Sequence, residues 1–205
     1  MKKVYVVGPE KRYSKWISDH VLTGNLDEAD IVIFTGGEDV TPSLYGCEKH
    51  HTTWSNLDRD LKEKEIFEKI RPDQFCIGIC RGSQLLCCLN GGLLIQDVTN
   101  HAIRHTHEIY KVNGRGVYEI TSTHHQMQYP FNLNEEDYKV LYYADFRSGY
   151  YAGDKIPRTI PCEPEIVLYQ KEGKPKCLAI QGHPEMMRLE SPTIAMLNDL
   201  INSLC

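Results

Sequence analysis

A cysteine flanked by glycines is the residue of this sequence with the clearest capacity for chemistry. The apolar run Phe75–Ile79 leads into Gly78-Ile79-Cys80-Arg81-Gly82, and a helical apolar pattern follows at once. This is the strand–turn–helix order of a nucleophile elbow, with cysteine in place of serine. A nucleophile on so tight a turn needs neighbours without a Cβ, and the helix N-terminus favours a thiolate. Cys80 is therefore a candidate nucleophile; the alternative is a buried structural cysteine at a strand end.

A second pattern near the other end of the chain supplies a partner for this thiol. Residues 177–180 are typical of a strand, and His183-Pro184-Glu185 follows in a loop. His183 is a candidate general base and acid for Cys80, and Glu185 a candidate for orienting the imidazole. A thiol, a base and an orienting carboxylate are the groups that acyl transfer needs.

These motifs resemble those of a known superfamily. Residues 78–84 resemble the nucleophile motif of the class I glutamine amidotransferases, which use a Cys-His-Glu triad, and residues 183–185 resemble the rest of that triad. Residues 35–46, 57–60 and 122–126 resemble the gamma-glutamyl hydrolase and gamma-glutamyl-gamma-aminobutyrate hydrolase branch, which is peptidase C26-like. The similarity runs over nearly the whole chain.

The resemblance implies cysteine-dependent hydrolysis of a gamma-glutamyl amide bond through a thioester, on a small-molecule substrate and without metal or organic cofactor. It assigns the oxyanion to the backbone N–H groups of Gly37 and Arg81. It also implies that five residues contact the substrate: Gly36, Gln84, His124, His125 and Gln126.

Each of these assignments has a simpler alternative. Glycine pairs such as Gly36-Gly37 are ordinary turn residues, although these follow a predicted buried strand. Gln84 is equally compatible with a solvent-facing position on its helix, and residues 122–126 with a turn between edge strands. The Arg81 side chain either binds a carboxylate or pairs with a structural acid.

Nine histidines make a metal site a hypothesis to consider. Three of them, His101, His105 and His107, lie in one stretch, and His124-His125 form a pair. Their spacing matches no closed zinc pattern, no carboxylate triad accompanies them, and cysteines do not alternate with them. The sequence therefore favours no metal.

Composition narrows the class of protein. The 205 residues carry a net charge of −5, and no basic stripe is present, which argues against a nucleic-acid partner. No apolar stretch approaches the length of a membrane span, and the first apolar run, residues 4–7, is too short for a signal peptide. The eight cysteines fall mostly in a strand–helix unit rather than in a disulfide framework, which is typical of the cytoplasm.

The apolar patterns predict the elements that position these residues. Strands are expected at 3–7, 30–34, 74–79, 93–95, 108–112, 116–120, 140–144, 166–169 and 177–180, and helices at 11–22, 58–70, 82–89 and 192–204. Residues 38–57 are expected to form a long functional loop, and residues 145–164 carry no recognised motif.

Strands that alternate with helices predict a mainly parallel sheet with helices on both faces. With the resemblance, this gives an α/β, flavodoxin-like three-layer sandwich with a small additional antiparallel sheet, in one domain over residues 1–205. Gly37, Cys80 and His183 each follow a predicted strand, so we expect them at one edge of the sheet.

Several functions share this predicted active site. The leading one is a stand-alone hydrolase of gamma-glutamyl conjugates, and the alternative is a glutaminase subunit that passes ammonia to a separate synthase. A non-catalytic binding module on the same fold is a third. Related elbow-cysteine families of chaperone or glyoxalase type have a histidine shortly after the cysteine, whereas His183 is distant from Cys80. The sequence leaves the oligomeric state open.

Overall fold

The computed structural model describes all residues, 1–205, and its centre is a nine-stranded sheet. The strands of this sheet are β1 (Lys2–Val6), β2 (His20–Leu22), β3 (Ile31–Phe34), β4 (Phe75–Ile79), β7 (His105–Lys111), β8 (Val117–Ser122), β10 (Tyr138–Ala144), β12 (Glu163–Tyr169) and β13 (Lys176–Ile180). Their order is β2-β1-β3-β4-β13-β12-β10-β7-β8. From β2 to β13 neighbouring strands run parallel, and from β13 to β8 they run antiparallel.

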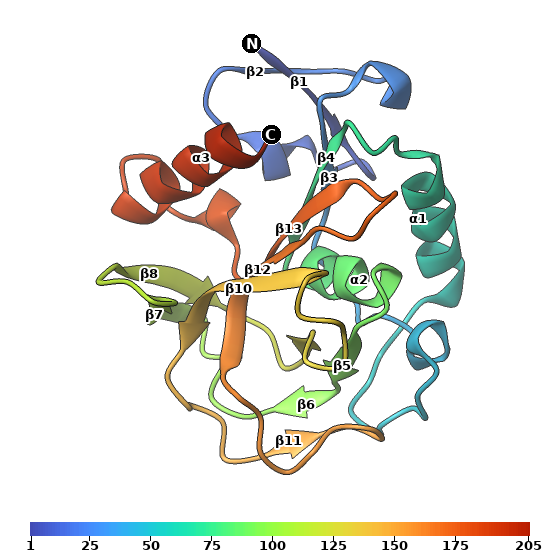
Figure 1. Ribbon diagram of the computed structural model, residues 1–205, viewed down its shortest axis with the longest axis vertical. Coiled ribbons are helices and arrows are strands. Elements are labelled where there is room, and N and C mark those ends of the chain that lie inside the picture. The colour runs from blue at the N-terminus through green and yellow to red at the C-terminus, as the bar shows by residue number, and fades with distance from the viewer.

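Two small antiparallel sheets lie below the main one (Figure 1). One pairs β5 (Leu93–Ile95) with β9 (Met127–Tyr129), and the other pairs β6 (Asp97–Val98) with β11 (Tyr151–Ala152). The predicted α/β class with a parallel core is confirmed, with two additional sheets where one was expected. The sequence missed β2, β6, β9 and β11, because two or three residues are too few to show an alternating pattern.

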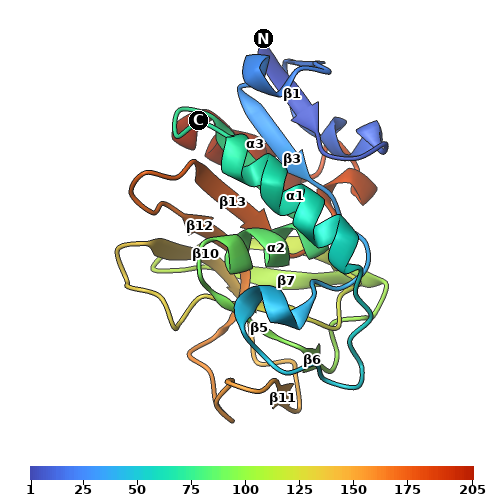
Figure 2. The ribbon, with the colours of Figure 1, turned by 90° about the vertical axis from the view of Figure 1, so that its right-hand side faces the viewer.

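Three helices cover the sheet from both sides. Helices α1 (Leu57–Lys69) and α2 (Arg81–Leu89) lie on one face and α3 (Pro192–Leu204) on the other (Figures 1 and 2). Side chains alternate along β3 accordingly: Ile31 and Ile33 join the core under α3, whereas Val32 and Phe34 join the core under α1 and α2. Burial on both faces explains why the central strands read as continuous apolar runs.

The predicted helix over residues 11–22 is wrong. Only Lys11–Ser14 is helical, as the 3-10 turn η1, and the chain then returns as the edge strand β2 beside β1. Asp19 turns the chain with a φ of 49°, and Ser18 is held by Asn198 of α3. Pairing at the sheet edge and the contact with α3 therefore override the helical spacing of the apolar residues.

The other helix boundaries follow from their caps. The Asn56 side chain accepts from the Arg59 amide and caps α1, so this helix begins at Leu57, one residue before the expected start. Ser191 caps α3 in the same way, with Pro192 in its first turn. None of the helices combines the length and the apolar character needed to cross a membrane.

The long loop after β3 is ordered by short elements. Of the 3-10 turns besides η1, η3 (Pro42–Tyr45) lies in this loop, whereas η2 (Leu26–Glu28) and η4 (Pro184–Met186) lie elsewhere in the chain. After η3 the loop comes back to Asp39: the Asp39 amide donates to the Trp54 carbonyl at 2.8 Å, and the Asp39 carboxylate accepts from the Trp54 amide. Both ends of the loop are thereby held beside β3.

Candidate active site

Cys80 occupies a strained turn between β4 and α2. Its φ of 52° and ψ of −110° are rare for a residue with a side chain. The glycines two residues before and two residues after Cys80 are required because no Cβ would fit at either position. A Cβ on Gly82 would lie 2.1 Å from the Phe34 carbonyl oxygen, and one on Gly78 would lie 2.5 Å from the Gly82 oxygen. The sequence-based reason for these glycines is therefore confirmed.

His183 immediately precedes the turn η4 and Glu185 lies within it, shortly after the neighbouring strand β13, which runs parallel to β4. The Nδ1 atom of His183 lies 2.7 Å from a carboxylate oxygen of Glu185. Strand β8 fixes the histidine backbone: its Thr121 hydroxyl accepts from the His183 amide at 2.7 Å and donates to the His183 carbonyl. The imidazole is thus held in place through both its ring and its main chain.

The electrostatics of the site favour the imidazolium form. Burial, the largest single influence, lowers the pKa of His183. Hydrogen bonding to the Cys80 sulfur and to Glu185, together with their negative charges, outweighs burial and raises this pKa to about 10. His183 is thereby suited to hold a proton opposite a thiolate.

Gly36 marks the point where the nucleophile and the base meet. A Cβ on this residue would lie 3.0 Å from the Cε1 atom of His183 and 3.7 Å from the Cβ of Cys80. The same position would be 2.9 Å from the hydroxyl of Tyr13, whose ring centroid lies 6.4 Å from that of His183. The end of β3 therefore lies against both side chains, as the edge argument predicts.

Arg59 of α1 braces the glycine loop. Its guanidinium donates to the Gly36 carbonyl at 3.0 Å and to the Thr35 hydroxyl at 3.3 Å, and it pairs with Glu63 at 2.8 Å. It fills the space beside Gly37, where a Cβ would lie 2.2 Å from a guanidinium nitrogen. Gly37 has a φ of 142°, so its backbone is fixed in a conformation that other residues rarely adopt.

The side chain of Arg81 pairs with structural acids. It is 1% exposed and forms ion pairs with Asp60 and Glu63 of α1. Its amide, by contrast, is the first of α2, so no carbonyl of the helix can accept from it. The Gly37 amide likewise makes no hydrogen bond within the protein. Two backbone amides without a hydrogen-bond partner thus lie on segments beside Cys80, one at the start of α2 and one in the loop after β3.

The remaining predicted substrate residues belong to two different environments. Gln84 is buried rather than solvent-facing and donates to the Gln126 carbonyl at 2.9 Å, while the Gln126 amide group reaches Thr53. His125 is partly exposed and lies between Asp39 and Asp97. His124 points away from this loop, toward a buried group of histidines and Glu165.

A cavity of about 430 Å³ adjoins the glycine loop. It is lined by Glu38, Trp54, Ser55, Asn56, Leu57 and Asp58. Residues 38–57 therefore form one boundary of an open space next to Gly37, although the sequence pointed to no residue of this cavity as a ligand contact.

Sequence reasoning missed two residues beside the triad. Neither Tyr13 nor Thr121 was expected at the site, yet both contact the segment that carries His183 or Gly36. Neither belongs to a chemically recognisable motif. Their positions depend on the contacts of β8 and η1 with η4, and the spacing of residues along the sequence does not predict these contacts.

Comparison with known proteins identifies the family of this chain. The family model for Peptidase C26 matches residues 16–135, more than half of the chain. The protein NtpR of Enterococcus hirae is 31% identical over 131 residues, which are 53% of this chain and 55% of NtpR. A glutamine amidotransferase-like protein, the YvdE homolog of Lactococcus lactis subsp. cremoris, is 40% identical over 81 residues, 37% of this chain and 43% of that protein. The chain thus spans about half the length of these relatives.

Among solved structures, the fold is similar to the CTPS glutaminase domain of Trypanosoma brucei, with a TM-score of 0.57 at 9% identity. The similarity covers 98% of this chain and 92% of that domain. This likeness concerns the fold, and the family match includes the elbow, the glycine loop and residues 124–126. The chain belongs to the Peptidase C26 family, within the class I glutamine amidotransferase-like superfamily.

Proposed function

We propose that this protein hydrolyses a gamma-glutamyl amide bond, with Cys80 as nucleophile, His183 as general base and acid, and Glu185 as the residue that orients the imidazole. The observation that carries the proposal is the meeting of the Cys80 turn with the hydrogen-bonded pair His183–Glu185 at the end of neighbouring parallel strands. All three side chains are buried, and the hydrogen bond to Glu185 holds the His183 ring in place.

The reaction has two stages. The Cys80 thiolate attacks the gamma-carbonyl carbon, and His183 donates its proton to the leaving nitrogen as the C–N bond breaks. A gamma-glutamyl thioester remains on the sulfur. Water then attacks the thioester carbon while His183 takes its proton, the C–S bond breaks, and glutamate leaves with the thiolate restored.

Two backbone amides are proposed to bind the oxyanion. The Arg81 amide is free because it begins α2, and the Gly37 amide is free on a loop that Arg59 braces. A preorganised donor of this kind contributes about 3–4 kcal/mol to the transition state. Gly36, Gln84 and the segment 124–126 are proposed to shape the substrate pocket.

The same site supports a second function, a glutaminase that passes ammonia to a separate synthase. The observation in its favour is the exposed apolar surface beside the glycine loop, where Trp54 is 79% exposed and Leu57 is 45% exposed. An apolar surface at the rim of an active site suits a protein partner. The two functions differ in whether free glutamine turns over when no partner is present.

Labelling with a glutamine-like chloroketone tests the shared chemistry. We expect one adduct per chain, on the peptide that contains Cys80, and no adduct in Cys80→Ala. The matched control is Cys205→Ala, because Cys205 is exposed at the last position of the chain and is not part of the proposed triad. Hydrolysis that survives Cys80→Ala would refute the mechanism.

A substrate screen then separates the two functions. Free glutamine and a set of gamma-glutamyl amides are supplied to the purified protein alone, and glutamate release is measured. Preference for a conjugate over glutamine supports the stand-alone hydrolase. Turnover of glutamine that rises on addition of a synthase supports the subunit.

A further inference from the structure

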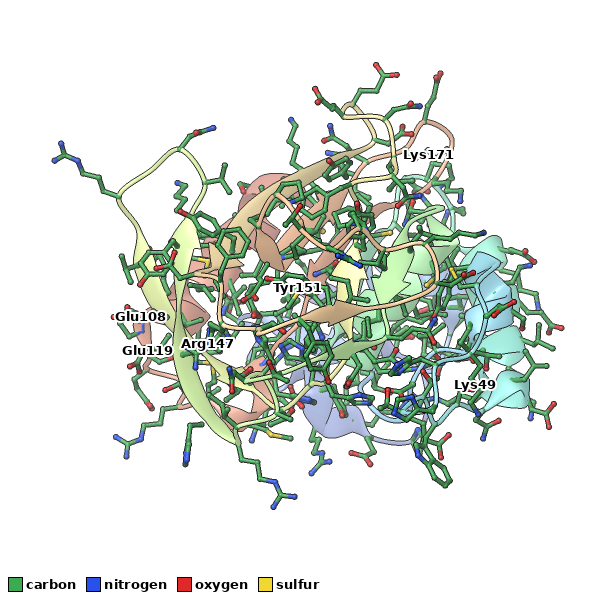
Figure 3. The ribbon with its side chains drawn as sticks, turned by 90° about the horizontal axis from the view of Figure 1, so that it is seen from below. Lys49, Glu108, Glu119, Arg147, Tyr151 and Lys171 are labelled. Carbon is green, nitrogen blue, oxygen red and sulfur yellow. The ribbon has the colours of Figure 1, made fainter.

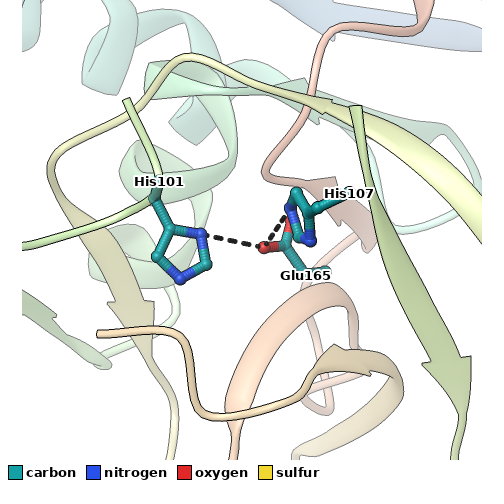
Figure 4. A group of neighbouring side chains, drawn as sticks. All are labelled: His101, His107 and Glu165. Atoms are coloured by element: carbon teal, nitrogen blue, oxygen red, sulfur yellow. Dashed lines mark ion pairs between the residues drawn. The ribbon is translucent and has the colours of Figure 1, made fainter. Parts of the chain in front are cut away.

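A group of buried histidines and glutamates lies outside the proposed triad. Two histidines, His101 before β7 and His107 on β7, converge on Glu165 of β12 (Figure 4). A third, His124, approaches the same carboxylate from the turn after β8. All four side chains are at most 5% exposed. The proposed hydrolysis uses none of their ring nitrogens.

The second ring nitrogen of each histidine is already engaged. The Nδ1 atoms of His107 and His124 lie 3.1 and 2.9 Å from backbone carbonyl oxygens, which only accept. The Nε2 atom of His101 lies 3.0 Å from Glu163. In the neutral rings these three nitrogens therefore carry the hydrogen, so the other nitrogen of each ring presents a lone pair.

The three lone-pair nitrogens surround one oxygen of Glu165. His107 Nε2 lies 3.1 Å, His101 Nδ1 3.5 Å and His124 Nε2 3.7 Å from the Oε1 atom. None of these nitrogens has a hydrogen-bond partner, and neither does either oxygen of Glu165. Buried polar atoms that converge in this way without hydrogen bonds are a place where a cation can bind.

The spacing fits a tetrahedral metal. Ligands about 2.0–2.1 Å from a zinc ion in tetrahedral geometry are separated by about 3.3 Å. The separations of His107 Nε2 and His101 Nδ1 from the Glu165 oxygen, 3.1 and 3.5 Å, lie around this value. The ligand atoms of His101, His107 and Glu165 also lie within 4.8 Å of one another, and His124 lies outside this group.

Charge points to a divalent ion. Glu163 and Glu165 are both fully buried, and neither forms an ion pair with a lysine or arginine. One divalent cation neutralises the two carboxylates. Two imidazoles among the three ligands select a transition metal over Mg²⁺ or Ca²⁺, which prefer oxygen ligands.

We propose that His101, His107 and Glu165 hold one divalent transition metal, for which Zn²⁺ is the best match. Three protein ligands leave the fourth position of a tetrahedral ion for a water molecule. The ion joins β7, β12 and the segment before β7, and His124 lies beside it, 3.7 Å from the same oxygen of Glu165.

Glu163 is the supporting residue of this site. It accepts from the amides of Arg147 and Ser148 and from the Tyr151 hydroxyl, besides the His101 ring. Figure 3 shows the segment that carries Arg147 and Tyr151 crossing the underside of the molecule. Residues 145–164, which carried no motif, thus orient a ligand histidine through Glu163.

Metal analysis of the untagged protein tests the proposal. After purification without nickel resin and dialysis against a chelating resin, we expect about one zinc per chain, and the same after reloading with ZnCl₂. Replacement by Co²⁺ should give the visible absorption of a four-coordinate site with mixed nitrogen and oxygen ligands. Zinc at 100 times its dissociation constant should raise the melting temperature of the stripped protein by about 5–10 °C.

Two neighbouring histidines provide the variant and its control. His107→Gln should lose stoichiometric zinc, whereas His105→Gln should keep it, because His105 is exposed on the same strand. Glu163→Gln should weaken zinc binding about 10–100-fold while leaving the ligands in place. If His107→Gln does not fold, the stoichiometry, cobalt spectrum and melting shift of the wild type still decide.

Three results would overturn the proposal. The first is less than a tenth of an equivalent of zinc after reloading. The second is an octahedral cobalt spectrum or no melting shift. The third is equal loss of zinc in His105→Gln, which would place the metal on surface histidines.

Discussion

Replacing Glu185 by glutamine should lower the pKa of His183 by a predictable amount. The carboxylate lies 2.7 Å from the ring, is 3% exposed, and is one of two groups that raise this pKa to about 10 against the opposing effect of burial. Glutamine keeps the size and an acceptor oxygen but removes the charge. The substitution therefore isolates the electrostatic part of the contact.

The magnitude follows from the strength of such a contact. A hydrogen bond to a charged group contributes about 1.5–3 kcal/mol net. At about 1.36 kcal/mol per pKa unit, its loss lowers the pKa by about 1–2 units. The imidazolium of Glu185→Gln should therefore lose its proton near pH 8–9, where that of the wild type keeps it.

The assay is NMR titration of protein labelled with ¹⁵N-histidine, with the His183 signals assigned by their loss in His183→Gln. Glu190→Gln is the matched control, because Glu190 is exposed in the same segment and has no contact with the ring. In a hydrolysis assay, the alkaline limb of the pH profile should move down by the same amount. An unchanged His183 titration in Glu185→Gln would refute the electrostatic account of the pair.

Three further predictions concern packing, buried charge and pH. Gly36→Ala should reduce chloroketone labelling of Cys80 about tenfold, because the added Cβ lies 2.9 Å from the Tyr13 hydroxyl and 3.0 Å from the His183 ring. Adding Tyr13→Phe should restore part of the labelling rate. A rate that stays low in the double variant would contradict the proposed contact. Arg81→Met should cost about 3–5 kcal/mol in chemical denaturation, because it leaves Asp60 buried without its ion-pair partner and leaves Glu63 with Arg59 alone. The exposed control Arg71→Met should cost under about 1 kcal/mol. The pKa of His183 in the folded protein, about 10, exceeds the unfolded value of 6.5. Protonated His183 therefore contributes fully to stability below pH 6.5, and this contribution is lost as the pH rises through 10. His183→Gln should flatten that part of the curve of unfolding free energy against pH.

Much of the candidate site could be predicted because its geometry is local. The Cys80 turn needs small neighbours at fixed positions, and space around Gly82 demands them in the fold. The edge position of Gly37 and His183 followed from their place after buried strands, since carboxyl ends of parallel strands share an edge. Such features are set by a few residues each, and the sequence displays them directly.

Other features depend on partners that are distant in the sequence. The apolar spacing of residues 11–22 suits a helix, but β2 exists because the chain pairs with β1 and is held by Asn198. The Arg81 side chain could not be assigned from its motif, because its partners Asp60 and Glu63 are on another helix. Tertiary contacts decide these cases, and one sequence does not reveal them.

The histidine group shows the same limit most clearly. Zinc motifs are recognised by ligands a few residues apart on one or two elements. Here the ligands come from the segment before β7, from β7 and from β12, and sheet pairing brings them together. A search by spacing therefore rejected a site that the fold assembles.

The turn 122–126 connects this histidine group to the proposed triad. His124 reaches Glu165, the Gln126 carbonyl accepts from Gln84 of the elbow helix, and the Gln126 side chain reaches Thr53 in the loop after β3. The turn 122–126 is thus hydrogen-bonded to the helix that follows Cys80 and to the loop that carries Gly37. If the metal fixes this turn, stripping it should slow chloroketone labelling of Cys80 in the wild type, and zinc should restore the rate. A labelling rate that does not respond to zinc would mean that the hydrogen bonds of Gln84 and Gln126 hold the turn by themselves.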